Sequence, residues 1–305
     1  MPEPAHAPVL PEETLSLLHP EPGDVVVDCT AGRGGHALEL AEQIGAEGTI
    51  VLLDLDAGNL EYAAGRLAEL PCRVHTVHGS FGRVHRSLDE LGLRANVLLA
   101  DLGFASNQMD DPARGFGFRQ DGPLDMRLDQ SRGRTAAELL ATCSERELID
   151  IIGRLGEEPL AARIARKVVQ ARDEQPIEQT GQLAQLVREA YGRRAATSRM
   201  NPATRTFMGL RIAVNDELAA LDALLAAIAR GSEAKASGGW LQSGARVGII
   251  SFHSLEDRPV KHAFSDLSRR GLARIDTRRP ITASEAEQRA NRRSRSAKLR
   301  VITLS

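Results

Sequence analysis

The chain has 305 residues, of which 42% are hydrophobic and 26% are charged, so it can bury a core and lacks the composition of a disordered protein. Its three cysteines, Cys29, Cys72 and Cys143, have no paired spacing, which excludes a disulfide scaffold or a cysteine zinc ribbon. No apolar run approaches the ~18 residues that a membrane span requires. We therefore expect a soluble, cytoplasmic protein that does not associate with a membrane.

Charge is unevenly distributed, although the net charge is only −2. Residues 1–60 hold eleven acidic side chains and one basic one, Arg33, whereas residues 269–300 hold eleven basic and three acidic ones. Such a basic stretch favours a polyanionic partner, with a solvated basic tail as the simpler alternative. Aromatic residues make up only 3% of the chain, so a broad base-stacking surface is not expected.

The first third of the chain alternates between short apolar runs and segments of helical periodicity, which predicts βαβ units and a parallel sheet. Crossover helices are expected at His36–Ile44 and Ala57–Leu70. The strands are expected at Val25–Val27, Ile50–Leu53, Val74–Val77 and Val97–Ala100.

After residue 100 the next apolar run is Val247–Ile250, and the chain between them is mostly helical in pattern. A crossover needs far fewer residues, so we predict a helical domain over residues 112–210, inserted into a sheet domain of residues 1–111 and 211–305. A long helical run, Arg205–Ala229, is expected to return to the sheet, with a loop at 237–239 and a late edge strand at Lys298–Thr303. The other helices are predicted at Ala136–Leu140, Glu145–Leu155, Leu160–Ala171 and Thr180–Tyr191.

A glycine-rich loop, Asp28–His36, follows the first predicted strand and opens a helix. Its glycines Gly32, Gly34 and Gly35 allow close approach of a ligand to the backbone, and the helix start offers free N–H groups. The second strand ends at Asp54, where a carboxylate can accept hydrogen bonds from both hydroxyls of a ribose. The combination predicts an adenosine-containing cofactor.

Asp28 discriminates between two such cofactors. Gly32-x-Gly34-x-x-Ala37 can be fitted to the dinucleotide fingerprint, but a carboxylate at the end of the strand would repel a pyrophosphate. The same carboxylate would attract the ammonium and sulfonium groups of S-adenosylmethionine. We therefore favour the methyl donor, with NAD and a ligand-free tight turn as alternatives.

The loop after the third strand places Phe81 either on the adenine of the cofactor or in the core. His75 and His78, three residues apart on a strand, point to opposite faces, so no metal site is expected.

The fourth strand leads into Asp101, Ser106 and Asn107, at the edge of the sheet where ligands of open α/β folds bind. The exocyclic amine of a nucleobase is a poor nucleophile, and acceptors that hold its hydrogens and take its proton assist its methylation. Carbon-5 methylation of cytosine generally uses a cysteine nucleophile, and no cysteine lies near this strand end. The pattern favours nitrogen as the methyl acceptor, with these three residues as catalytic candidates.

Ordered motifs extend over most of the chain: His6–Leu10, Asp28–His36, Asp101–Gly103, Gln108, Asp110-Asp111, Arg114–Phe116, Asp121–Arg127, Pro202–Phe207, Ser251–Arg258 and Arg295–Arg300. In these motifs the chain resembles the bacterial cytosine-N4 methyltransferases of small-subunit ribosomal RNA (the RsmH/MraW type). The resemblance implies a Rossmann-like S-adenosylmethionine-dependent methyltransferase sheet with an inserted helical substrate-binding domain. It also implies methylation of one cytosine N4 in the decoding region of 16S ribosomal RNA, within the small ribosomal subunit.

The resemblance also implies positions for the cofactor. By their place in the family motifs, the cofactor-binding residues are Gly34, Gly35, His36, Asp54, Phe81, Asp101 and Gln108. The pattern of the glycine loop adds Asp28 and Gly32. The chain departs from the family at Phe104, Ala105 and Asn107, where Val, Ser and Pro are usual, and at Ala31, where Phe is frequent. These changes leave open a non-catalytic RNA-binding or ribosome-assembly factor of the same fold. DNA is not expected as a partner, because the Asn/Asp-Pro-Pro-aromatic run of DNA amino-methyltransferases is missing.

Substrate-binding candidates lie in three further segments. Asp125 and Arg127 end a long glycine-rich loop and are expected near the target base, or else form an ion pair that fixes the loop. His253 follows the fifth strand, where it can contact RNA, orient the base, shuttle a proton or serve the fold. The third segment, Arg188 to Arg211, has one acid, Glu189, and with the C-terminal cluster that includes Arg295 it is expected to contact phosphates. Its arginines are Arg188, Arg193, Arg194, Arg199, Arg205 and Arg211.

Overall fold

The computed structural model describes residues 8–198, 200–234 and 239–305, and the chain divides into two compact units. The sheet unit comprises Met1–Gly103 and Leu218–Ser305, and the inserted unit comprises Phe104–Glu217. The inserted unit thus extends beyond the predicted range 112–210 at both ends. His6 and Ala7 of the first motif, Arg199, and two residues of the predicted loop at 237–239 lie outside the described residues.

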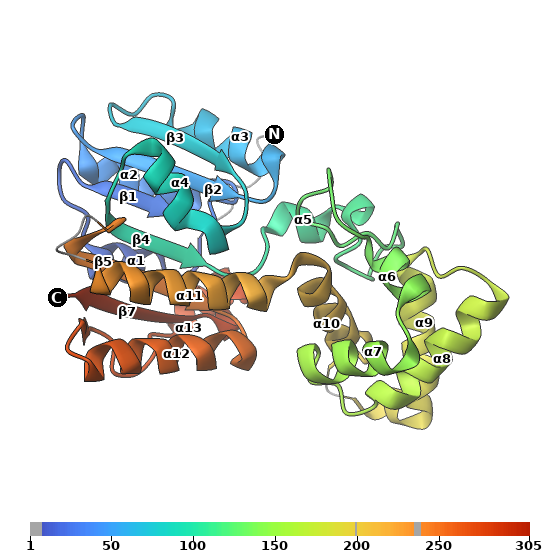
Figure 1. Cartoon of the computed structure of the whole chain (residues 1–305). Coiled ribbons are helices and arrows are strands. Elements are labelled where there is room, and N and C mark those ends of the chain that lie inside the picture. The colour runs from blue at the N-terminus through green and yellow to red at the C-terminus, as the bar shows by residue number, and fades with distance from the viewer. Residues whose placement is uncertain (1–7, 199, 235–238) are drawn as a thin grey trace. The chain divides into compact units, whose positions relative to one another are not determined.

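The sheet unit is built on seven strands in the order β3-β2-β1-β4-β5-β7-β6 (Figure 1). Strands β1 to β5 are parallel, and β7 runs antiparallel to both β5 and β6. All five predicted parallel strands are present, which confirms the α/β class. The strands are β1 (Val25–Asp28), β2 (Thr49–Asp54), β3 (Arg73–His78), β4 (Ala95–Asp101), β5 (Leu241–Ser251), β6 (Ala273–Ile275) and β7 (Lys298–Leu304).

The predicted edge position of the last strand is wrong. β7 lies between β5 and β6, and the three-residue β6 forms the edge. β6 is too short to show an apolar pattern in the sequence, whereas β7 is almost entirely buried and needs a neighbour on each side for its backbone groups.

Helices cover both faces of the sheet, and alternating strand residues enter two separate cores. Val27 belongs to the core that includes Leu88 and Leu224, and Val26 belongs to the core that includes Leu18 and Leu40. Burial on both faces explains the continuous apolar runs of β1, β2 and β4. The helices of this unit are α1 (Pro11–Leu18), α2 (Gly35–Ile44), α3 (Ala57–Leu67), α4 (Val84–Leu91), α11 (Glu217–Glu233), α12 (Ser254–Arg269) and α13 (Glu285–Ala290).

The inserted unit is helical. Capping boxes begin two of its helices, because Thr135 and Ser144 each exchange hydrogen bonds with a glutamate three residues later. α7 continues into a π-helical turn at Ile151–Leu155. The helices are α5 (Ser106–Asp110), α6 (Ala136–Thr142), α7 (Glu145–Asp150), α8 (Ala161–Glu174), α9 (Thr180–Tyr191) and α10 (Ala203–Asn215).

The single long helix predicted at Arg205–Ala229 is wrong. The segment forms α10 and α11, which are separated at Asp216, where the backbone is left-handed with a φ of 50°. A left-handed residue ends a helix, and the periodicity of the apolar residues does not register this one-residue break. In the described part of the chain, no helix is both long and apolar enough to cross a membrane.

Candidate functional site

Three carboxylates lie at the carboxyl ends of adjacent strands in the centre of the sheet. Asp28 ends β1, Asp54 ends β2 and Asp101 ends β4, and β1 pairs with both of the other strands. The carboxyl ends of parallel strands meet at one edge of the sheet, which is where ligands of open α/β folds bind. The fold therefore brings three of the predicted site residues together.

The glycine loop is fixed by hydrogen bonds to these strand ends. The N–H of Gly32 donates to Asp54 Oδ2 over 2.7 Å, the N–H of Thr30 donates to Asp28 Oδ1, and the N–H of Asp101 donates to Thr30 Oγ1 over 2.7 Å. Gly34 has a φ of 74°, and a Cβ there would lie 3.2 Å from Ala63. A side chain at Gly34 would thus be strained and crowded. The loop is therefore preformed at the start of α2.

Burial raises the pKa values of all three carboxyls. The pKa of Asp28 rises to about 7 and that of Asp54 to about 6, mainly through burial, and the charge of Asp54 adds to the effect at Asp28. The pKa of Asp101 is raised well above its usual value by burial and by the charges of Asp28 and Glu256. Mutual repulsion of this kind is relieved by a cation. The ammonium and sulfonium groups of S-adenosylmethionine supply such charge, so the residues present fit this cofactor.

Two polar atoms at the same place support this fit. Asp101 Oδ1 and His36 Nε2 are both buried and without a hydrogen-bond partner in the described part of the chain, and His36 Nε2 lies 3.9 Å from Asp101 Oδ2. Burial lowers the pKa of His36 to about 4, so its imidazole is neutral at pH 7. Buried polar groups left unsatisfied are costly, and their clustering here indicates a place for a polar ligand.

The remaining predicted cofactor and catalytic residues are Phe81, Ser106, Asn107 and Gln108. Phe81 packs, partly buried, against the core of the sheet unit, and a contact of its ring with the adenine stays a prediction. Ser106, Asn107 and Gln108 belong to α5 of the inserted unit, where Gln108 Oε1 accepts the N–H of Ala105 over 2.8 Å. Their approach to Asp101 stays a prediction.

The altered residue Phe104 has a packing role within the inserted unit. Its ring stacks on Phe116 with centroids 5.4 Å apart, and the guanidinium of Arg211 lies 4.7 Å above it. Arg211 also makes a bidentate pair with Glu217. The prediction that Arg211 contacts phosphate is therefore not supported by its surroundings, since its charge is already neutralised.

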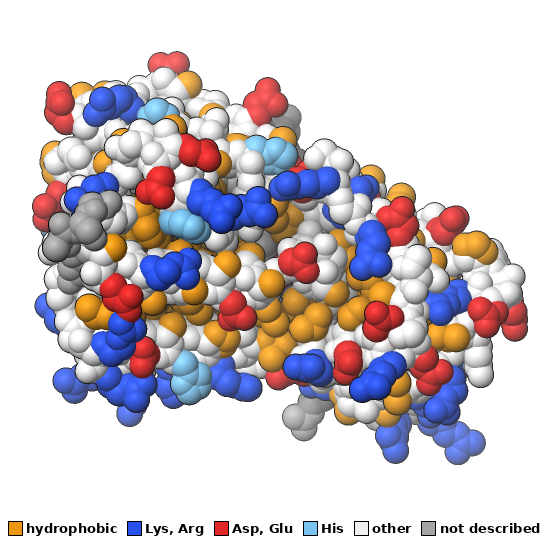
Figure 2. Space-filling model, in the orientation of Figure 1, with side chains coloured by type: hydrophobic (Ala, Val, Ile, Leu, Met, Phe, Trp, Pro, Cys, Tyr) orange, Lys and Arg blue, Asp and Glu red, His pale blue; other side chains and the backbone are white. Residues whose placement is uncertain are grey.

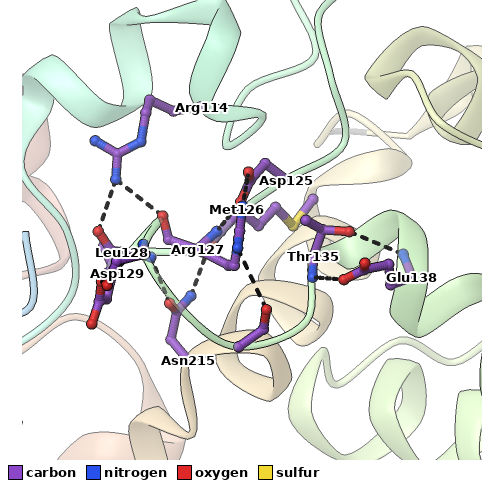
Figure 3. A network of polar contacts seen from close by, with 11 residues as sticks. Arg114, Asp125, Met126, Arg127, Leu128, Asp129, Thr135, Glu138 and Asn215 are labelled. Atoms are coloured by element: carbon purple, nitrogen blue, oxygen red, sulfur yellow. Dashed lines mark hydrogen bonds and ion pairs between the residues drawn. The ribbon is translucent and has the colours of Figure 1, made fainter.

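Asp125 and Arg127 form a bidentate ion pair with N–O distances of 2.8 Å (Figure 3). Between them Met126 is fully buried and has a left-handed backbone, with a φ of 64°. Arg114 donates to the carbonyls of Arg127 and Leu128, and Asn215 bonds the carbonyl of Met126 and the N–H of Leu128. The structure thus shows the ion pair that fixes the loop. A contact with the target base stays a prediction.

The remaining substrate-binding candidates differ in exposure. Arg295 is exposed on a short helical turn, and Arg205 is half-buried near the start of α10. The His253 side chain is 13% exposed, and its Nε2 lies 3.1 Å from Glu256 Oε1. Several other arginines of the C-terminal cluster pair with acids, such as Arg274 with Asp276. Contacts of Arg205, His253 and Arg295 with RNA stay predictions.

Sequence reasoning missed three residues of these clusters: Glu256, Arg114 and Asn215. Glu256 lies within a recognised motif, three residues after His253 at the start of a helix, and that spacing is the available signal. Arg114 also lies in a motif. Asn215 carries no local signal, because its partners are 87 and 89 residues away in the chain.

The sheet is parallel except for one reversed strand, a glycine loop follows β1, and an acid ends β2. These features together define the class of the Rossmann-like, S-adenosylmethionine-dependent methyltransferases. The model of the MraW methylase family matches residues 3–305. The chain is 43% identical to the ribosomal RNA small subunit methyltransferase H of Pelobacter propionicus, over 97% of both chains. It is 42% identical to the protein of the same name from Geotalea uraniireducens, again over 97% of both chains. The chain belongs to the MraW methylase family.

Proposed function

We propose that this protein transfers a methyl group from S-adenosylmethionine to the exocyclic N4 amine of a cytosine in 16S ribosomal RNA, within the small ribosomal subunit. The observation that carries the proposal is the set of three strand-end carboxylates with raised pKa values beside a preformed glycine loop. Relatives at 42–43% identity that are named for ribosomal RNA methylation support the substrate class.

The cofactor would be held by residues of the sheet unit. Asp54 accepts hydrogen bonds from ribose hydroxyls, and Asp28 provides negative charge for the cationic groups. When bound, S-adenosylmethionine supplies an electrophilic methyl group. The backbone N–H groups of the loop, the neutral His36 and the ring of Phe81 complete the proposed contacts of the sheet unit, and the amide of Gln108 is proposed to add one from the inserted unit. The loop residues are Gly32, Gly34 and Gly35.

Asp101 is the proposed catalytic base. Its free Oδ1 accepts an N–H of the target amine, which localises the nitrogen lone pair, and the carboxylate takes the proton as the new N–C bond forms. Its raised pKa makes it a stronger base than an ordinary carboxylate. Ser106 and Asn107 are proposed to hold the second amine hydrogen and the rest of the base.

RNA is proposed to bind both units. The target base must leave its stack to reach the strand ends, and Arg205, His253 and Arg295, with Asp125 and Arg127, are proposed to guide it. Figure 2 shows Lys and Arg side chains along the lower margin of the sheet unit, where Figure 1 places α12. Such groups can neutralise RNA phosphates.

The test is methyl transfer from labelled S-adenosylmethionine to small ribosomal subunits that lack their own N4 methyl group. Digestion and mass spectrometry identify the product nucleoside. N4-methylcytidine at a single site supports the proposal, and 5-methylcytidine would contradict it. Cofactor binding without transfer would instead favour the alternative, an RNA-binding or ribosome-assembly factor.

A further inference from the structure

Glu256 is a deeply buried carboxylate that the proposed reaction does not yet use. It lies in the first turn of α12 and is 3% exposed. Its Oε2 accepts the N–H of Phe252 over 2.8 Å, and its Oε1 lies 3.1 Å from His253 Nε2. The hydrogen bond from Phe252 holds the carboxylate in place, whereas the approach to His253 lacks hydrogen-bond geometry in the described part of the chain. A buried charge is expensive unless it is compensated, so its presence calls for an explanation.

The fold places Glu256 near Asp101. β5 pairs with β4 so that Ile250 lies opposite Asp101, and the N–H of Leu102 donates to the carbonyl of Ile250 over 2.9 Å. The Ile250 carbonyl thus joins the chain directly after Asp101 to the segment that carries Glu256. The Glu256 charge is one of the causes of the raised pKa of Asp101. Both residues belong to the sheet unit.

We infer that Glu256 is a positioning residue for methyl transfer, which acts on Asp101 from the β5 side of the sheet through its buried charge and lies 3.1 Å from His253 Nε2. This inference rests on the proposed function. Asp101 is faced by Asp28 from β1, by the neutral His36 from α2 and by Glu256 from α12. Glu256 supplies the contribution from the β5 side, so its removal should make Asp101 a weaker base without touching the cofactor loop.

The neighbouring Asp257 provides a matched comparison. It lies on the same turn of α12, but it forms a 2.7 Å contact with Arg300 and a 3.6 Å contact with Lys298. These cations lower the pKa of Asp257, although burial opposes them. Of these two successive acids, Asp257 is thus neutralised by cations, whereas Glu256 faces His253 and Asp101. If Glu256 were only structural, neutralising either acid should have similar effects on stability and activity. If Glu256 acts on the reaction, only its own neutralisation should change the pH dependence of kcat.

The experiment compares Glu256→Gln with Asp257→Asn in the full chain, using small ribosomal subunits as substrate. For Glu256→Gln we expect kcat on the pH plateau to fall about tenfold. The acid limb of the kcat profile should move down by about one pH unit, because a nearby negative charge has been removed. Asp257→Asn should lower the melting temperature and leave the midpoint of that limb unchanged.

A second readout does not depend on turnover. Calorimetric titration gives the affinities for the cationic S-adenosylmethionine and for its neutral product, S-adenosylhomocysteine. Loss of the Glu256 charge should reduce the preference for the cation about threefold, whereas Asp257→Asn should leave it unchanged.

The outcomes separate the two claims. If the wild type does not methylate cytosine N4, the proposed function fails. If the wild type is active but Glu256→Gln changes only the melting temperature, with an unchanged kcat midpoint and binding preference, Glu256 is structural and the inference is overturned. Equal shifts of the midpoint in both variants would also overturn it, because the effect would then not depend on the position of the charge.

Discussion

Two groups of acidic side chains, the strand-end acids of the sheet unit and the loop acids of the inserted unit, differ in the direction of their pKa shifts. In the sheet unit, burial and the charges of neighbouring carboxylates raise the pKa values of Asp28, Asp54 and Asp101. In the inserted unit, Asp125 and Asp129 have lowered pKa values because burial is outweighed by hydrogen bonds, from Arg127 to Asp125 and from Ser131 and Arg132 to Asp129, and by the charges of these arginines. Acids with cations stabilise the fold, whereas acids without them destabilise it and remain available for a ligand. The contrast indicates that the reacting groups lie in the sheet unit and that the loop of Figure 3 stabilises the inserted unit.

The largest expected effect is on activity, from Asp101→Asn. The amide cannot accept the amine proton, so methyl transfer should fall between about 10²- and 10⁴-fold. The fold should be retained and even stabilised, because a repelling charge has been removed. Methyl transfer to small subunits and the melting temperature measure the two effects. Asp266→Asn, an exposed change on α12, is the control and should alter neither. An unchanged rate for Asp101→Asn would show that another group takes the proton.

The second expected effect is on stability. The free energy of unfolding should change with pH in opposite directions in the two units. In the folded state Asp28 keeps its proton up to about pH 7, whereas its usual value is 3.8. The sheet unit should therefore lose stability as the pH rises from 4 to 7, by about 1.4 kcal/mol per pH unit at most from this group. The lowered pKa of Asp125 makes a stabilising contribution above the ordinary pKa, and that contribution is lost as the pH falls.

Trp240 allows the units to be observed separately. It is the only tryptophan and is buried in the sheet unit, so its fluorescence during urea unfolding reports that unit. Hydrogen exchange of peptides from residues 104–217 reports the other. Saturating S-adenosylmethionine should flatten the pH slope of the tryptophan transition. A slope of the same sign in both units would contradict the comparison.

Different parts of the molecule were predictable for different reasons. β1, β2, β4 and the second half of β5 could be predicted because burial on both faces makes each a continuous apolar run, and the strand-end acids follow directly from the strands. The more exposed β3 could be predicted only from its valines, Val74 and Val77. β6 could not, because three residues show no periodicity. The break at Asp216 depends on one backbone conformation, and the Arg114–Asn215 network depends on contacts between residues far apart in the chain. Glu256 lay in a recognised motif, but its burial beside Asp101 follows only from the pairing of β4 with β5.

The third expected effect is a loss of stability in the inserted unit alone. Asp125→Asn removes one charge from an ion pair whose side chains are 13% and 20% exposed, and it leaves Arg127 poorly compensated. We expect the free energy of unfolding of this unit to fall by about 2 kcal/mol. Hydrogen exchange of residues 104–217 should accelerate, and the Trp240 transition should stay unchanged. If the stability is unaffected while methyl transfer falls more than tenfold, Asp125 acts on the substrate instead.

The smallest expected effect is that of Glu189→Gln. It tests whether an ion pair must be buried to stabilise the inserted unit. Glu189 contacts Lys167 over 2.8 Å, as short as the Asp125–Arg127 contact, but its side chain is 45% exposed. Exposed pairs contribute little, because water screens the charges and ordering two long side chains opposes the attraction. Glu189→Gln should therefore leave the unfolding of the inserted unit within experimental error under the conditions used for Asp125→Asn. If the two variants destabilise it equally, pairing alone is sufficient. The low pKa of Asp125 would then no longer distinguish a buried support from an ordinary surface contact.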